Sequence, residues 1–154
     1  MLSSDKDFIQ LHAYDNVEQF SPVLKKFLRH EDPEMYLKEH IIKGDRGDGI
    51  PNINSPDGVF VDGVIQKPIR RNTIESVANL NIEVIEHYDA FIKKEMKRNW
   101  LRNRQLIDLS LIPDNIKSQI LEEYTNYKIN DRSKLFNFFI EKKLSNLMES
   151  IGEF

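Results

Sequence analysis

The sequence predicts an α/β fold in which a small strand-bearing front precedes a mainly helical body. Alternating apolar and polar residues at 17–21 and 25–29 are typical of two short strands, and the SPVL between them favours a hairpin. The following segment, 44–70, is rich in Gly, Pro, Asn and Asp, which indicates loops. From residue 73 onward, apolar residues recur close to the 3.6-residue period of a helix.

The local signals for helix ends are clearest around one predicted helix. Asp32 is expected to cap it, Pro33 occupies its first position, and Gly44 ends it just after Lys43. A tight two-residue turn is expected at Asp62–Gly63. Further helices are expected at 73–80 (capped by Asn72 or Thr73), 87–107, 114–127, 133–144 and 146–151. The side chains expected to form the helical core are Phe91, Trp100, Leu121, Tyr124, Phe136, Phe139 and Leu147.

Composition restricts the class of protein. The chain has 154 residues, enough for a modest core, and its 40% hydrophobic and 31% charged residues are ordinary for a globular protein. Without cysteine it can form neither disulfides nor thiolate metal sites. No apolar run approaches the length of a membrane span, so we expect no membrane partner.

Two pairs of aspartates are the candidate metal ligands. Asp5 and Asp7 form D-x-D near the N-terminus, and Asp45 and Asp48 form D-x-x-D just beyond a predicted helix end. Magnesium prefers oxygen ligands and keeps several waters, so separated carboxylate pairs suit it. The alternative is that these aspartates are solvated or cap local turns, which is common for such short patterns.

Glycines and basic residues suggest contact with phosphates. Gly44, Gly47 and Gly49 permit positive φ, which can aim successive backbone N–H groups at an anion, although a flexible linker explains them too. Positive charge gathers in 93–104, with six Lys or Arg and one acid, and in "QKPIRR". These clusters would neutralise phosphates, or they are solvated helix faces. The four histidines show no metal-like spacing, and we interpret them as surface or packing residues.

The motifs "LSSDKDFIQL" and "IIKGDRGDGIPNI" resemble the second half of a flap-endonuclease-type 5′ nuclease. Within that family, "LIDLSLIPDNI" and "KLSNLMESIGEF" are similar to the C-terminal domain of the ribonucleases H of T-even bacteriophages. The resemblance spans essentially the whole chain. It implies a remnant of the α/β nuclease core with a helix–three-turn–helix motif over residues 1–53, and a helical C-terminal domain over 54–154.

The resemblance also implies an activity and its residues. The family removes RNA primers and 5′ flaps from duplex DNA by magnesium-dependent phosphodiester hydrolysis, with two Mg²⁺ ions in the complete enzyme. By the family motifs, the catalytic and metal-binding residues are Asp5, Asp7, Asp45 and Asp48. The residues expected to contact DNA are Lys43, Gly44, Arg46, Gly47, Gly49, Lys67, Arg70 and Arg71.

The family's nuclease domain begins with a further half, which this sequence does not match. We therefore expect an incomplete central sheet, exposed Leu2, Phe8, Ile9 and Leu11, and little or no activity of the chain alone. A split gene, an internal start and an incomplete record all remain open.

The expected partners are DNA or RNA–DNA duplex with a 5′ end or flap, a separate N-terminal nuclease half, and phage replication proteins such as the single-stranded-DNA-binding protein. The expected location is the cytoplasm of the infected host cell. The alternatives are a non-catalytic duplex-DNA-binding or replisome-docking module, and a merely structural helical domain.

Overall fold

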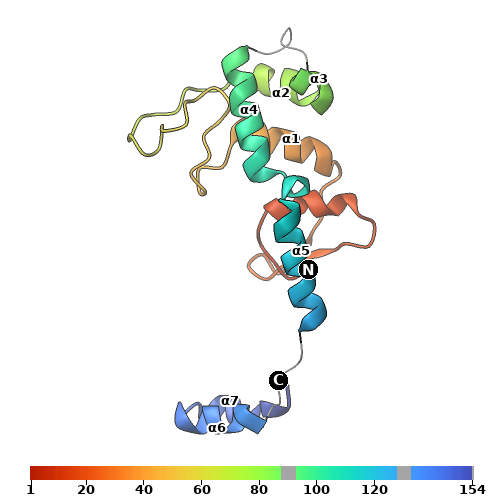
Figure 1. Cartoon of the computed structure of the whole chain (residues 1–154), viewed down its shortest axis with the longest axis vertical. Helices are drawn as coiled ribbons and strands as arrows, with labels where there is room; N and C mark the ends of the chain where they lie inside the picture. The colour runs from red at the N-terminus through yellow and green to blue at the C-terminus, as the bar shows by residue number, and fades with distance from the viewer. Residues whose placement is uncertain (88–92, 128–132, 154) are drawn as a thin grey trace. The chain divides into compact units, whose positions relative to one another are not determined.

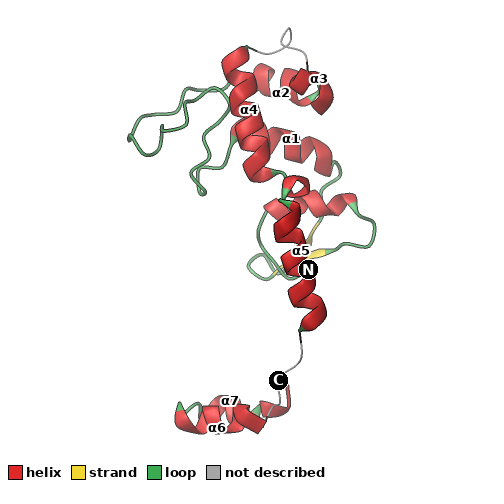
Figure 2. Ribbon diagram, in the orientation of Figure 1, coloured by secondary structure: helices red, strands yellow, loops and turns green. Residues whose placement is uncertain are grey.

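The computed structural model describes residues 1–87, 93–127 and 133–153, which form two compact units, Met1–Ile112 and Pro113–Phe154. Over these residues the chain is mostly helical with one small two-stranded sheet (Figures 1 and 2). The helical character agrees with the predicted fold, whereas the helix–three-turn–helix assignment stays a prediction. The predicted domain boundary after Ile53 falls inside the first unit, where Ile53 is fully buried.

The first unit begins with the predicted hairpin. Strands β1 (Gln19–Ser21) and β2 (Lys26–Leu28) pair antiparallel, with Phe20 opposite Phe27. Leu2 adds a single parallel bridge to Phe20, so the described residues contain no larger sheet. Between this bridge and β1 lies a 3₁₀ helix that the sequence pattern did not predict, η1 (Asp7–Ala13).

The predicted exposure of the N-terminal apolar residues is only partly right. Leu2 is exposed, as expected, but Phe8 and Leu11 are half-buried and Ile9 is buried. The reason is η1, which packs against the first α-helix and turns one side of the segment inward.

That helix, α1 (Pro33–Lys43), has the predicted bounds. The Asp32 side chain accepts a hydrogen bond from the Met35 N–H at 2.8 Å, and Gly44 ends the helix with φ 68°. Ile41 and Ile42 on its last turns are fully buried in the core of the unit. Helix α1 therefore carries the carboxylate turn that follows it on a rigid support.

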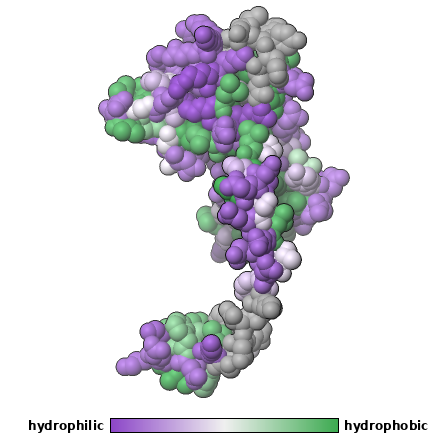
Figure 3. All heavy atoms as spheres, viewed as in Figure 1, coloured by the Kyte–Doolittle hydropathy of each residue, from purple (hydrophilic) through white to green (hydrophobic). Residues whose placement is uncertain are grey.

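The segment between α1 and α2 is a loop, as predicted (Figure 2). Its base is closed where the Asn52 side chain donates to the Lys67 carbonyl and the Ser55 hydroxyl accepts from the Lys67 N–H, both at 3.0 Å. The expected two-residue turn at Asp62–Gly63 is wrong, because no strands flank it and the closing hydrogen bond runs from the Val64 N–H to the Val59 carbonyl. The loop's far end is apolar, with Val61 90% and Ile65 91% exposed, and Figure 3 shows hydrophobic surface there.

Helices α2 (Arg71–Ala78), α3 (Ile82–His87) and α4 (Lys94–Ile107), with a short 3₁₀ turn η2 (Leu109–Leu111), complete the first unit. The predicted cap of α2 is wrong, because Asn72 and Thr73 lie inside its first turn and no side chain caps it. The single helix predicted over 87–107 is also wrong, because Lys93 has extended backbone angles and α4 begins after it. Trp100 of α4 is fully buried in the core, as predicted, whereas Leu101 is exposed.

The second unit consists of α5 (Asp114–Asn126), α6 (Ser133–Glu141), α7 (Ser145–Glu149) and η3 (Ile151–Glu153). Phe139 is buried where α6 packs against α7, as predicted. Leu121, Tyr124, Phe136 and Leu147 are exposed, which corrects their assignment to a common core; Phe91 lies outside the described residues. A unit this small cannot enclose all of its apolar side chains, and Figure 3 shows hydrophobic surface on it.

Candidate metal centre and nucleic-acid surface

The D-x-D segment is fixed by its contacts with β1. Gln19 is fully buried in that strand, and its side-chain amide donates to the carbonyls of Ser3 at 3.0 Å and Asp5 at 2.6 Å. The Asp5 carboxylate in turn accepts from the Asp7 N–H at 3.0 Å, just where η1 begins. Gln19 of β1 thus holds the backbone at Asp5, and Asp5 in turn fixes Asp7 at the start of the 3₁₀ helix.

The D-x-x-D turn is closed tightly on itself after α1. At Gly44 a Cβ would lie 2.3 Å from the Ile50 carbonyl oxygen, so only glycine fits where the two ends of the turn cross. Asp45 fills the turn's interior: its Oδ1 accepts from the N–H groups of Gly47 at 2.7 Å and Asp48 at 3.3 Å.

These bonds correct the expected anion nest. The N–H groups of Gly47, Asp48 and Gly49 all donate within the turn, so they are not directed at an external phosphate. Gly44 and Gly49 have positive φ, as expected, but Gly47 does not. The glycines shape the turn, and their predicted contact with DNA stays a prediction.

A buried side-chain amide of α4 holds the two ends of the turn by hydrogen bonds. The fully buried Asn103 side chain donates to the carbonyls of Ile41 and Pro51, each at 2.8 Å. Ile41 lies in the last turn of α1, where helix carbonyls have no intrahelical partner. One side chain therefore joins the residues on both sides of the 44–50 turn.

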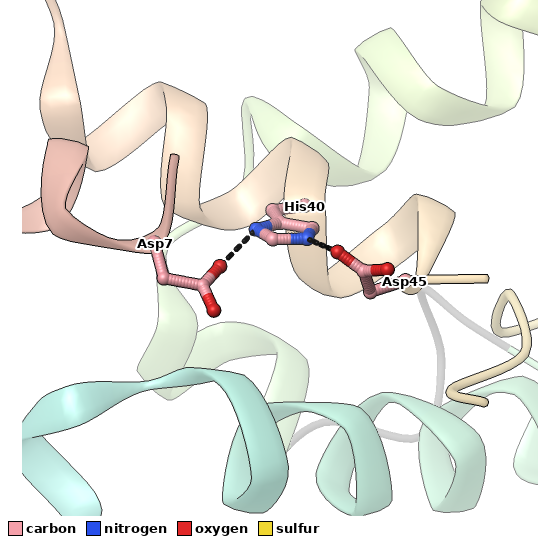
Figure 4. A group of neighbouring side chains, drawn as sticks. All are labelled: Asp7, His40 and Asp45. Atoms are coloured by element: carbon pink, nitrogen blue, oxygen red, sulfur yellow. Dashed lines mark hydrogen bonds and ion pairs between the residues drawn. The ribbon is translucent and has the colours of Figure 1, made fainter. Parts of the chain in front are cut away.

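The two carboxylate motifs meet at His40, in the last turn of α1 (Figure 4). One ring nitrogen, Nε2, lies 3.2 Å from Asp45 Oδ2, and the other, Nδ1, lies 3.5 Å from Asp7 Oδ1. The fold therefore brings Asp7 of the first motif and Asp45 of the second together at one histidine. Asp5 and Asp48 are exposed beside them, close enough for their charges to act on Asp7.

The charges of this cluster shift the pKa values of its members. Burial raises the pKa of Asp7, His40 opposes the rise, and the negative charges of Asp5, Asp45 and Asp48 add to it. Burial alone would raise the pKa of Asp45, but the N–H groups of Asp48 and Gly47, together with His40, hold it below the usual value. The cluster is therefore richer in negative charge than its own histidine compensates, a condition that favours a bound cation.

His40 and Gln19 were not singled out by the sequence, although both position the carboxylates. The assignment of His40 as an ordinary surface or packing histidine is wrong, because it lies between two aspartates. The available signal was its place one helical turn before the G-D-x-x-D motif. For Gln19, the signal was a polar residue in an inward position of the predicted strand.

The predicted DNA-contacting side chains fall into two groups. Lys43 pairs with Glu39, and Arg71 pairs with Glu75 at 2.7 Å, so their charges are partly compensated. Arg46, Lys67 and Arg70 are exposed, and the structure gives their side chains no acidic partner among the residues it describes.

A groove of about 420 Å³ joins two of the predicted basic clusters. Arg70, at the start of α2, and Lys93, just before α4, both line it, as do Thr73 and Ser76 of α2. In contrast, Arg98 and Arg102 of α4 both bond to the Asp57 carboxylate of the loop. Those two arginines hold the loop on α4 and are therefore less available to a phosphate.

Comparison with known proteins agrees with the motifs. The family model described as T4 RNase H, C terminal, matches residues 31–154. The chain belongs to the T4 RNase H family. Ribonuclease H of Enterobacteria phage T4 is 33% identical to it over 159 residues, which cover 100% of this chain and 51% of the phage protein. The chain thus spans about half the length of the curated relative it matches. None of the helices described is long and apolar enough to cross a membrane.

Proposed function

We propose that this chain takes part in magnesium-dependent cleavage of phosphodiester bonds at the 5′ ends or flaps of duplex nucleic acid, as in the removal of RNA primers in a phage-infected cell. The observation that carries the proposal is the meeting of Asp7 and Asp45, from motifs far apart in the sequence, at one cluster with excess negative charge. Membership of the T4 RNase H family supports it.

In this proposal, Asp5, Asp7, Asp45 and Asp48 hold the Mg²⁺ ions or their waters. The raised pKa of Asp7 fits such a role, because a group that is costly to ionise among other carboxylates gains most from a nearby cation. When bound, magnesium activates water and stabilises the charge that develops on the scissile phosphate. The turn from Gly44 to Ile50 holds Asp45 with one oxygen bonded to the backbone, so its carboxylate keeps a fixed direction.

The duplex would be held through its backbone by the exposed basic residues. Arg70 and Lys93, which line one groove, would supply positive charge, and Lys67 and Arg46 are further exposed cations on the loop that links α1 and α2. Contacts of this kind ignore base sequence and weaken steeply with salt.

The experiment that tests the activity is cleavage of a 5′-flap substrate with Mg²⁺. We would assay this chain alone and together with the half of the T4 enzyme that this chain does not match. We expect cleavage only in the mixture, and we expect Asp48→Asn to reduce both cleavage and Mg²⁺ affinity. Robust cleavage by the chain alone would refute its dependence on a second half.

The second candidate is a duplex-binding or replisome-docking module without catalysis. The observation that favours it is the Arg70–Lys93 groove, to which no carboxylate of the cluster contributes. Duplex affinity would be measured over a salt series for wild type, for Arg70→Ala with Arg71→Ala, and for the matched control Lys26→Ala on the hairpin. Removing a side chain that truly contacts a phosphate should lower the salt slope by about one unit. Salt-dependent binding with no cleavage in any mixture would favour the module.

A further inference from the structure

The imidazole of His40 has the environment of a metal-binding histidine. Its side chain is only 13% exposed, and the last turns of α1 hold it between the two carboxylates drawn in Figure 4. The Tyr36 ring, one turn earlier, packs against it edge-on with ring centroids 5.9 Å apart. Packing on α1 therefore limits the directions in which the ring can point.

The two ring nitrogens differ in their contacts. Nε2 lies at hydrogen-bonding distance from Asp45 Oδ2, 3.2 Å away, and the other oxygen of Asp45 is bonded to backbone N–H groups. Nδ1 is buried and has no hydrogen-bond partner in the part of the chain that the structure describes; its nearest acidic atom is Asp7 Oδ1 at 3.5 Å. A histidine that binds a metal through one ring nitrogen almost always donates the N–H of the other to a carboxylate, a backbone carbonyl or water, and the contact between Nε2 and Asp45 fits this arrangement.

The spacing of the donors suits a single ion. One donor atom from each of Asp7, His40 and Asp45 can be chosen so that all lie within 4.8 Å of one another. Two ligands bound to one ion at about 2.0–2.2 Å lie about 3–4.4 Å apart. His40 Nδ1 and Asp7 Oδ1, 3.5 Å apart, already lie within this range, whereas Asp45 contacts the opposite ring nitrogen.

We propose that His40 is a ligand of the cation held beside Asp7, with Asp45 orienting the imidazole, and that the site therefore binds a borderline cation such as Co²⁺ or Mn²⁺ more tightly than Mg²⁺. The chemical reason is that imidazole nitrogen suits transition metals, whereas magnesium prefers sites made of oxygen. This inference rests on the proposed metal function and adds to it a nitrogen ligand and a preference among cations.

The test is calorimetric titration of the whole chain, without nucleic acid, with Co²⁺ and with Mg²⁺. The variants are His40→Ala and His40→Gln, and the matched control is His30→Ala, which removes a histidine outside the cluster. Because a substitution on α1 could affect folding, thermal unfolding of each variant is measured first, and the Gln variant retains a polar side chain of similar reach.

We expect wild type to bind Co²⁺ at least about tenfold more tightly than Mg²⁺, with a Co²⁺ absorption spectrum that changes when His40 is replaced. Both His40 variants should lose about 10- to 100-fold in Co²⁺ affinity and change Mg²⁺ affinity by less than about threefold. His30→Ala should match wild type.

An unchanged ratio of Co²⁺ to Mg²⁺ affinity in the His40 variants, with Mg²⁺ still bound, would overturn the role of His40 and leave the proposed function intact. Tighter binding of both cations by the variants would also overturn it, because it would make His40 a positive charge that competes with metal. If wild type binds neither cation, the proposed metal function fails as well.

Discussion

Replacing Asn103 with alanine should loosen the support beneath the carboxylate turn. Asn103 donates to the Ile41 and Pro51 carbonyls at 2.8 Å each, from a position with no solvent exposure. After the substitution, Pro51 would keep the bond from the Arg102 guanidinium at 3.0 Å, whereas the structure gives the Ile41 carbonyl no second donor among the described residues. One buried carbonyl would thus lose its only donor, and a second bond would disappear.

The expected cost follows from these two losses. A buried acceptor left without a donor costs about 1–3 kcal/mol, and an ordinary hydrogen bond contributes about 1 kcal/mol. We therefore expect Asn103→Ala to lower the free energy of unfolding by about 2–4 kcal/mol. The matched control is Gln105→Ala on the exposed face of the same helix, which should stay within about 0.5 kcal/mol of wild type.

Urea unfolding followed by tryptophan fluorescence measures this directly. The chain has one tryptophan, Trp100, which is fully buried in the core of the first unit and so reports its unfolding. We expect the midpoint of Asn103→Ala to fall while the slope stays unchanged. A loss no larger than that of Gln105→Ala would refute the reasoning that this amide fixes the turn.

Three further substitutions have definite expected outcomes. Gly44→Ala should destabilise the chain far more than Gly49→Ala in the same urea assay. Both glycines have positive φ, but only at Gly44 would a Cβ meet backbone, 2.3 Å from the Ile50 carbonyl oxygen. Equal losses of stability would contradict this close approach of the Gly44 and Ile50 backbones. Hydrogen bonds from Arg98 and Arg102 lower the pKa of Asp57 to about 2, so its contribution to stability is present above the ordinary aspartate pKa and is lost as the pH falls toward 2. Asp57→Asn should therefore lower the free energy of unfolding by up to about 1 kcal/mol at pH 7, a small value because the ion pair is half-exposed. The difference in unfolding free energy from wild type should shrink between pH 4 and pH 2, and a difference independent of pH would refute the ion pair. Burial and neighbouring carboxylates raise the pKa of Asp7, so its ionisation costs stability as the pH rises through that pKa. With a chelator at pH 7, Asp7→Asn should thus unfold at the same temperature as wild type or a higher one. Excess Mg²⁺ should raise the unfolding temperature of wild type only. Equal stabilisation of wild type and Asp7→Asn by Mg²⁺ would show that Asp7 is not part of the metal site.

The sequence by itself determined the features that depend on neighbouring residues. Helix α1 was predicted with its correct bounds because a capping aspartate, a proline at the first position and a terminal glycine act within a few residues of each other. The hairpin was predicted because alternation and a turn are also local. The motifs around Asp5 and Asp45 indicated the family, and the comparison confirmed it.

Only the tertiary structure decided how those local pieces form a site. No spacing along the chain says that His40 lies between Asp7 and Asp45, because η1 brings Asp7 to α1 by packing. Nor does any local pattern say that Asn103 bonds to the two ends of the turn, or that the first compact unit ends at Ile112. Such contacts join residues far apart in sequence, and their energy depends on burial and on which polar groups are left unpaired, which appear only once the chain has packed.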